Sequence, residues 1–422
     1  MRVVLERIFK MKVLMVNKFF YIKGGSETYY FSLKKLLEKN GHEVIDFSMK
    51  DERNFDSPYS RYFVNNIDYN KKQNFFTKVK LGLKIIYSTE AKKNLEKLIK
   101  DTKPDIAHLH IFQHQLTSSV IDVLKKYNIP IVYTAHDLKM ICPNYRMLDR
   151  EYRICERCKN DRYYNCLKNK CIKRSYLKSF IGMSEAYFNK YLKKYEKIDY
   201  IITPSEFYRK KFIEFGIEPK KIEHISNFLD NTEIKYDKNI DSNYYLYFGR
   251  LSEEKGIMTL VKVAQNTGIT LKIVGTGIEE ENIKKYILEK KLNNIKMYGF
   301  KSGKELYTIV ANAKCVIIPS EWYENGPYSA IEALKLGVPI IGADIGGIPE
   351  LINDNGFIFK SGDVKSLELA IKNFEKLNKE ELKKYSVNSK NEFYNIYNEE
   401  NHYKNIIKIY EKVIKNKKGE KN

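Results

Sequence analysis

Two glutamates in the second half of the chain, Glu324 and Glu332, have the residue type and spacing to build a binding site. Seven residues separate them, and Gly326-Pro327 marks the start of a helix between them, because proline is favoured at the first helical position. We therefore expect Glu324 in a loop and Glu332 inside the helix, with both carboxylates facing one site. The N–H groups of the helix start suit an anion, and Glu332 can accept two ribose hydroxyls.

A pair of cations is expected close to these carboxylates. Gly249-Arg250 follows an aliphatic run, and Lys255 comes a few residues later at the start of a helical pattern. Ligands of open α/β sheets bind at the carboxyl ends of the strands, so two cations there form a candidate pyrophosphate site. Gly275 and Gly277 end the next expected strand and allow a second close approach of the backbone. A solvated Arg and Lys flanking a loop is the alternative interpretation.

The first half of the chain offers a glycine pair and a histidine. Gly24-Gly25 follows the first expected strand. The helix that begins near Ser26 presents unpaired N–H groups to an anion, although a tight turn also requires glycine for structural reasons. His136 follows the expected strand at 129–134. A histidine at the end of a parallel strand lies where ligands bind, which favours a functional role over a structural one.

Five of the six cysteines cluster in the first half of the chain. Their C-x2-C and C-x4-C spacings are compatible with a structural zinc site, whose four thiolates would be Cys155, Cys158, Cys166 and Cys171. Cys142 is a surplus thiol upstream, and free or redox-active thiols are an equal alternative to zinc. Disulfides are not expected without an export signal. Cys315 lies in an aliphatic run and is expected to be buried in a strand.

Two sheets are needed to position these residues, and the apolar pattern predicts two halves of alternating strands and helices. Short aliphatic runs followed by helical patterns are typical of parallel sheets covered on both faces. Strands are expected at 11–17, 43–47, 105–109, 129–134 and 200–203, and then at 244–248, 270–274, 295–297, 315–318 and 339–342. The fold class is therefore α/β, with two doubly wound Rossmann-like domains.

A polar stretch at 230–243 interrupts the periodicity and is the expected domain boundary. The expected units are an N-terminal domain at 1–230 with a Cys-rich insertion at about 142–171, a C-terminal domain at 231–400, and a helix with a Lys-rich tail at 401–422. The tail is expected to be disordered from Lys415 onward. Met11 resembles a natural start, because the first strand begins there, which makes residues 1–10 an extension.

Charge is unevenly spread along the 422 residues. The chain carries 75 basic and 53 acidic residues, or +22, of which residues 1–230 contribute 45 and 27, or +18. Such a field attracts nucleic acid, an anionic membrane surface or a phosphorylated substrate, and proteome-wide bias is a further explanation. The composition, 43% hydrophobic with 10 prolines, excludes disordered and disulfide-dense classes. Without an apolar run of about 18 residues or a signal peptide, a cytoplasmic location is expected.

The segment at 319–334, with 337–339 and 346–350 behind it, resembles the donor domain of glycosyltransferase family 4, retaining enzymes of the GT-B fold. The resemblance spans most of the chain. Glu324 and Glu332 are similar to the E-x7-E motif of this family. The residues just after Glu324 depart from the commoner forms of the motif, which leaves the transferred sugar open.

The resemblance implies a role for each candidate. Arg250 and Lys255 would clamp the departing nucleoside diphosphate. Glu324 would bind hydroxyls of the donor sugar, Glu332 would bind the ribose, and His136 would lie beside the sugar from the opposite domain. Further donor-binding positions are Gly24, Gly25, Gly249, Gly275, Gly277, Asn325, Gly326 and Pro327.

The expected function is transfer of a sugar from a nucleotide-sugar donor to a glycan or lipid-linked acceptor, in cell-surface polysaccharide biosynthesis. No Asp-x-Asp occurs in the sequence, so no catalytic metal is expected. A nucleotide-sugar epimerase or hydrolase of the same fold is the alternative. A basic nucleic-acid-binding protein is the rival from another class, but it leaves the two glutamates without a role, so no nucleic acid is expected.

A segment at 74–87 mixes apolar residues with Lys78, Lys80 and Lys84, as an interfacial helix does. A domain-packing helix with a solvated basic edge is the alternative. Together with the charge of the first half, the segment favours a lipid-linked or membrane-surface acceptor and a peripheral location at the inner face of the membrane.

Overall fold

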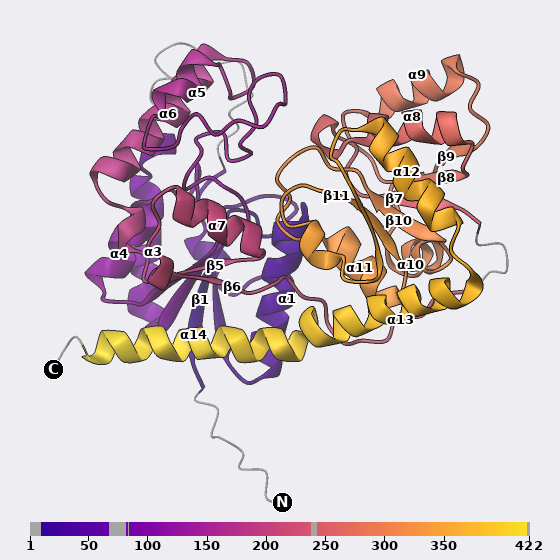
Figure 1. Ribbon diagram of the computed structural model, residues 1–422. Helices are drawn as coiled ribbons and strands as arrows, with labels where there is room; N and C mark the ends of the chain where they lie inside the picture. Colours follow the sequence, from indigo (N-terminus) through magenta and orange to yellow (C-terminus); the bar gives the residue numbers. More distant parts are fainter. Residues whose placement is uncertain (1–9, 67–81, 83, 238–242, 420–422) are drawn as a thin grey trace, which may run out of the picture.

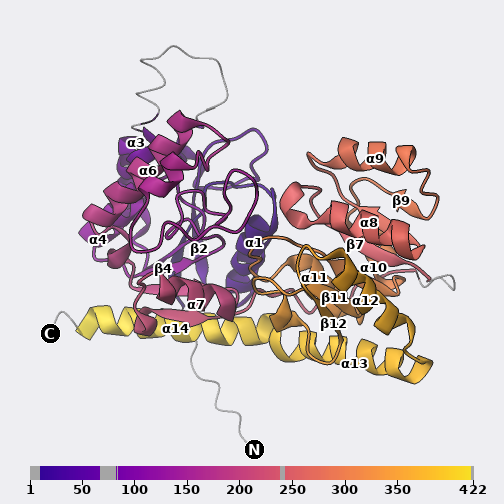
Figure 2. The same ribbon diagram turned by 45° about the horizontal axis from the view of Figure 1, so that its top comes forward.

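A computed structural model describes residues 10–66, 82, 84–237 and 243–419. They form two α/β domains side by side, and the last helix runs along the N-terminal domain (Figures 1 and 2). The predicted pair of doubly wound Rossmann-like domains is confirmed. Lys78 and Lys80 of the proposed interfacial segment lie outside the described residues.

Each domain contains one parallel sheet of six strands, in the orders β2-β1-β3-β4-β5-β6 and β12-β11-β10-β7-β8-β9. The N-terminal strands are β1 (Lys12–Val16), β2 (Glu43–Phe47), β3 (Ile106–Leu109), β4 (Ile131–Thr134), β5 (Tyr200–Thr203) and β6 (Ile222–His224). The C-terminal strands are β7 (Tyr245–Phe248), β8 (Leu271–Val274), β9 (Ile295–Met297), β10 (Cys315–Ile318), β11 (Ile340–Ala343) and β12 (Gly356–Phe359).

Helices and short 3-10 turns connect the strands. In the N-terminal domain they are α1 (Gly25–Lys39), η1 (Ser60–Tyr62), α3 (Thr89–Thr102), α4 (Ser119–Lys126), α5 (Tyr164–Lys168), α6 (Tyr176–Tyr191), η2 (Tyr195–Lys197), α7 (Glu206–Glu214) and η3 (Pro219–Lys221). The remainder are η4 (Glu253–Lys255), α8 (Ile257–Thr267), α9 (Glu280–Glu289), α10 (Gly303–Ala311), α11 (Tyr328–Leu336), η5 (Pro349–Leu351), α12 (Val364–Glu375), α13 (Lys379–Ile396) and α14 (Glu399–Gly419). None of the described helices combines the length and the hydropathy that crossing a membrane requires.

Strand β1 shows why both faces of the sheet must be covered. Successive side chains of a strand point to opposite faces. Leu14 and Val16 pack into one core with α3 and α4, whereas Val13 and Met15 pack into a second core with α1 and α14. Such strands read as continuous apolar runs, which is why all ten predicted strands are present.

The sequence analysis missed the edge strands β6 and β12. Only Ile222 of β6 is fully buried, and β12 is partly exposed until Phe359. A strand that is half exposed and three or four residues long carries no apolar run or clear alternation, so its pattern does not differ from that of a loop.

Helix α14 joins the end of the chain to the N-terminal domain. Its side chains Ile406, Ile409, Tyr410 and Val413 belong to the core beneath α1 and β1. Lys39 forms an ion pair with Glu399 at 2.8 Å. The expectation of disorder from Lys415 was wrong, because α14 continues to Gly419.

Candidate functional site

Glu324 lies in the loop between β10 and α11, as predicted, and α11 begins directly after Pro327. The Glu324 carboxylate is 5% exposed. Its Oε1 accepts hydrogen bonds from Lys255 Nζ at 2.5 Å and from Ser320 Oγ at 2.7 Å. Burial disfavours the ionised form, but these partners outweigh it and hold the pKa of Glu324 below its ordinary value. Glu324 is therefore a buried, ionised acceptor of hydrogen bonds.

Arg250 and Lys255 lie on the same connection between β7 and α8, but they pair with different carboxylates. Arg250 Nη2 donates to Glu254 Oε1 at 2.9 Å, and its side chain is 60% exposed. Lys255 turns inward to Glu324. The structure thus brings Lys255 to the loop of Glu324 and leaves Arg250 exposed at the edge of the candidate site.

Gly275 and Gly277, which follow β8, allow two neighbouring loops to pack closely against one another. A Cβ on Gly275, whose φ is +134°, would lie 1.9 Å from the Gly249 carbonyl oxygen. A Cβ on Gly277 would lie 2.0 Å from the Leu251 carbonyl oxygen. We expected these glycines to let a ligand come close to the backbone. In the structure they first of all let the loop after β8 pack on the neighbouring loop that carries Arg250.

Glu332 lies on α11, as predicted. Burial raises its pKa to about 7, and the nearby Lys335 ammonium opposes this rise. Within the described residues the Glu332 carboxylate makes no hydrogen bond with another side chain or with the backbone. Its acceptor capacity is therefore available to hydroxyl groups of a ligand.

The loop that follows Glu324 meets the N-terminal domain. Asn325 Nδ2 donates to the Ala135 carbonyl oxygen at 2.7 Å, and Ser205 Oγ donates to Asn325 Oδ1 at 3.0 Å. Gly25 lies against Tyr328, since a Cβ on Gly25 would be 3.3 Å from the tyrosine ring. The His136 loop therefore adjoins the loop of the first glutamate, and the glycine pair adjoins the start of α11 directly after it.

Behind His136 lies a buried histidine network that the sequence analysis missed. His110 Nδ1 is 3.1 Å from His136 Nε2, and the two rings are stacked. His108 Nε2 is 2.7 Å from Thr134 Oγ1, and its Nδ1 is 2.7 Å from Tyr410 Oη on α14. Burial lowers the pKa of His136 to about 3. A His-x-His at the end of β3, beside the strand that precedes His136, was the available signal.

Tyr29 links the network to α14 on a second side. Its hydroxyl lies 3.0 Å from His402 Nε2, and its ring lies edge-on to the His136 ring with 5.0 Å between centroids. The last helix of the chain therefore supports the histidine loop of the N-terminal domain.

The cysteine-rich insertion forms a cluster of its own. Cys158, Cys166 and Cys171 are buried together, and Cys166 is hydrogen-bonded to Cys171. Among the residues that the structure describes, no three His, Cys, Asp or Glu side chains are arranged to hold a metal ion. Zinc binding by Cys155 and these three thiols stays a prediction. Cys315 is buried in β10, as expected.

Two family models match the chain. Residues 23–233, half of the chain, match the model described as Glycosyltransferase Family 4, and residues 230–392 match that of Glycosyl transferases group 1. The two matches meet at the expected domain boundary and together include every residue of the candidate donor site.

Curated relatives are similar over different lengths. An uncharacterized glycosyltransferase of Methanocaldococcus jannaschii is 26% identical over 185 residues, 43% of this chain and 52% of the relative. An uncharacterized 42.6 kDa protein in the cps region of Klebsiella pneumoniae is 23% identical over 379 residues, 85% and 92% of the two chains. The O-antigen chain mannosyltransferase C of Escherichia coli is 21% identical over 209 residues, 49% and 55%.

Solved structures share the fold. Sucrose-phosphate synthase from Thermosynechococcus elongatus has a TM-score of 0.71 at 16% identity, with 96% of this chain and 99% of that chain covered. HepE of Anabaena, in complex with UDP and glucose, has a TM-score of 0.66 at 16% identity, with coverages of 95% and 100%. The two-domain architecture is therefore that of GT-B glycosyltransferases.

Proposed function

This chain belongs to glycosyltransferase family 4, and from that premise we propose that it moves a sugar with retention from a nucleotide-sugar donor to a glycan or lipid-linked acceptor. The observation that carries the proposal is the buried Lys255–Glu324 pair at 2.5 Å. The segment that follows Glu324 contacts the His136 loop through Asn325 and Gly25 through Tyr328. A cation, a carboxylate and a neutral imidazole at one domain junction suit a diphosphate, a sugar and the bond between them.

In the proposed reaction the bond between the sugar C1 and the diphosphate oxygen breaks, and a bond between C1 and the acceptor oxygen forms on the same face. The acceptor proton passes to the departing diphosphate. Lys255 and the more exposed Arg250 stabilise the charge that grows on the diphosphate, which is largest in the transition state. We propose that no metal ion is needed for this step.

The donor is held through its two ends. Glu332 accepts hydrogen bonds from the ribose, and Glu324 accepts hydrogen bonds from the sugar. The UDP complex of a structural neighbour supports a nucleoside diphosphate sugar as the donor class. The similarity to an O-antigen chain mannosyltransferase supports cell-surface polysaccharide synthesis as the setting.

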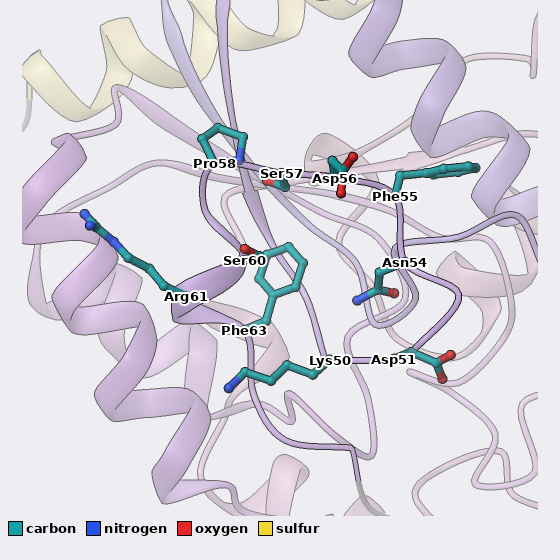
Figure 3. A pocket seen from close by; sticks show the side chains of 10 residues that line it. All are labelled: Lys50, Asp51, Asn54, Phe55, Asp56, Ser57, Pro58, Ser60, Arg61 and Phe63. Atoms are coloured by element: carbon teal, nitrogen blue, oxygen red, sulfur yellow. The ribbon is translucent and has the colours of Figure 1, made fainter.

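A hollow of about 580 Å³ between β2 and η1 is the proposed place for part of the acceptor (Figure 3). Phe55, 50% exposed, offers an apolar face to a sugar ring, while Lys50 and Arg61 suit a phosphate. Its polar lining includes Asn54, Ser57 and Ser60. The loop packs on the connection that carries the glycine pair, because Phe55 N donates to the Phe20 carbonyl oxygen at 3.0 Å.

The test is a panel of nucleotide sugars screened by thermal shift, followed by turnover with acceptor mixtures and assignment of the product anomer by NMR. A ligand that binds the folded state raises its apparent stability. We expect a shift for one donor class, lost in Glu332→Ala and kept in the exposed control Glu289→Gln. Inverted product, or no shift with any nucleotide sugar, would contradict the proposal.

A further inference from the structure

Helix α6 presents an aromatic stripe to solvent. Tyr176, Phe180 and Tyr191 are spaced so that, at about 100° per residue, they fall on one face of the helix. Tyr187 lies on the same face but is partly buried, because it packs against the cluster of Cys158, Cys166 and Cys171. Tyr176 is 60% exposed, Phe180 51% and Tyr191 80%. The Tyr187 ring stacks on Tyr191 with 6.1 Å between centroids. Large apolar side chains are thus gathered where a surface helix normally carries polar residues.

The opposite face of α6 explains why the aromatic residues cannot turn inward. Its buried residues are Ser179, Gly182, Glu185 and Asn189. A Cβ on Gly182 would lie 2.4 Å from Ile172 Cδ1, and Glu185 forms a buried ion pair with Lys139 at 2.8 Å. Small and polar side chains therefore occupy the fully buried positions of the helix, while Tyr176, Phe180 and Tyr191 stay outward.

Positive charge surrounds the stripe. Residues 162–195 contain nine basic residues and one acidic residue, which is the buried Glu185. Lys170 lies over the Tyr176 ring at 4.1 Å. In the described part of the chain, no carboxylate lies within ion-pair distance of Lys168, Lys173, Lys178 or Lys193. The helix stands on the side of the N-terminal domain away from the C-terminal domain (Figures 1 and 2).

We propose that this α6 face is a docking surface for an anionic lipid bilayer. Tyr and Phe rings partition into the headgroup region, and unpaired lysines around them are attracted to anionic lipid. A second copy of the chain fits less well, because two such faces would oppose like charges. The inference rests on the proposed function, because docking on a bilayer would bring the enzyme to a lipid-linked acceptor.

Co-sedimentation with vesicles tests the surface. The full chain is mixed with phosphatidylcholine vesicles and with phosphatidylcholine/phosphatidylglycerol vesicles, at low and high salt. One variant combines Tyr176→Ser, Phe180→Ser and Tyr191→Ser, and another combines Lys170→Gln, at the lysine that lies over the Tyr176 ring, with Lys173→Gln. Phe300→Ser is the control, because Phe300 is 72% exposed on the C-terminal domain.

The parent and Phe300→Ser are expected to bind the anionic vesicles, less at high salt. The lysine variant should lose about fivefold in binding per lysine, and the aromatic variant should lose most binding at any salt. Equal binding to both vesicle types, unchanged binding of the variants, or a dimer in solution that the aromatic variant abolishes would overturn the proposal. Donor binding measured without vesicles should be unchanged in every variant. This measurement therefore distinguishes a failure of the proposed transferase function from a failure of the docking proposal.

Discussion

Lys255 Nζ lies 2.5 Å from Glu324 Oε1, and the two side chains come from the connections that follow the neighbouring parallel strands β7 and β10. Both side chains are largely buried, with 19% and 7% of their side-chain surface exposed. A buried pair of this kind is costly to break, because the charge that remains has lost its partner but not its low-dielectric surroundings. The pair therefore stabilises the C-terminal domain and also holds the Lys255 ammonium at the candidate donor site.

Lys255→Ala is expected to lower the free energy of unfolding by about 2–3 kcal/mol, since it strands the Glu324 carboxylate. Arg250→Ala should cost less than about 1 kcal/mol, because Arg250 is exposed and its ion pair is screened. Both variants should lower kcat more than donor affinity. Urea denaturation and steady-state kinetics in EDTA measure these effects. Wild-type activity in both variants, or a requirement of the parent for Mg²⁺, would exclude the metal-free clamp.

Glu332 should make both stability and donor binding depend on pH. Its pKa is about 7 in the folded protein against an ordinary value of 4.5. The folded state therefore holds an extra proton between these pH values, so stability falls as pH rises from about 4.5 to 7. In Glu332→Gln the free energy of unfolding should decrease less between pH 5 and pH 8 than in the parent, as measured by urea denaturation at the two pH values.

Ribose hydroxyls favour the ionised form of Glu332, so donor affinity should rise from pH 6 to pH 8 in the parent. Calorimetry at these pH values should give a flatter profile for Glu332→Gln. Parallel profiles in the two proteins would assign the titration to another group.

His110 should act on catalysis through the tautomer of His136. Within the described residues His110 Nε2 is buried without a hydrogen-bond partner, so the proton is best placed on Nδ1, where it is donated to His136 Nε2. His136 would then carry its own proton on Nδ1. We expect His110→Leu to lower kcat by about 10–100-fold with little change in donor affinity. His110→Asn, whose amide can donate in the same place, should recover much of the rate, whereas equal losses in both variants would indicate a packing role.

The sequence predicted the interior of both sheets and the positions of Glu324, Glu332 and Lys255, because buried parallel strands and their carboxyl edges leave strong local patterns. It did not predict that Lys255 pairs with Glu324 while Arg250 pairs with Glu254. Partner choice between side chains 69 residues apart depends on tertiary packing. His402 and Tyr410 were missed for the same reason, since no local pattern of α14 shows that it packs on the N-terminal domain and reaches Tyr29 and His108.

The cysteine insertion gives a prediction that is independent of catalysis. If Cys155, Cys158, Cys166 and Cys171 bind zinc, elemental analysis of protein purified without added metal should find one zinc per chain. Cys158→Ser should lose the metal and lower the melting temperature, whereas Cys142→Ser should keep the metal. Zinc-free protein that is folded and active would establish free thiols instead.

Glu350 is expected to hold the two domains together through a helix end. Its carboxylate accepts hydrogen bonds from the backbone N–H groups of Glu206 at 2.8 Å and Phe207 at 2.7 Å. These groups begin α7 of the other domain, where a negative charge is favoured by the helix dipole. Glu350→Ala should therefore cost about 1–2 kcal/mol in the free energy of unfolding.

The same substitution should also loosen the domain junction. Small-angle scattering is expected to show a larger radius of gyration for Glu350→Ala, with a higher KM for the acceptor and little change in donor affinity. Glu350→Gln keeps an acceptor oxygen and should lie between the parent and Glu350→Ala in both measurements. A control at Glu214, whose Lys211 partner is on the same helix, removes a similar charge without touching the junction. If Glu214→Ala expands the molecule equally, the effect belongs to net charge rather than to the contact between Glu350 and α7.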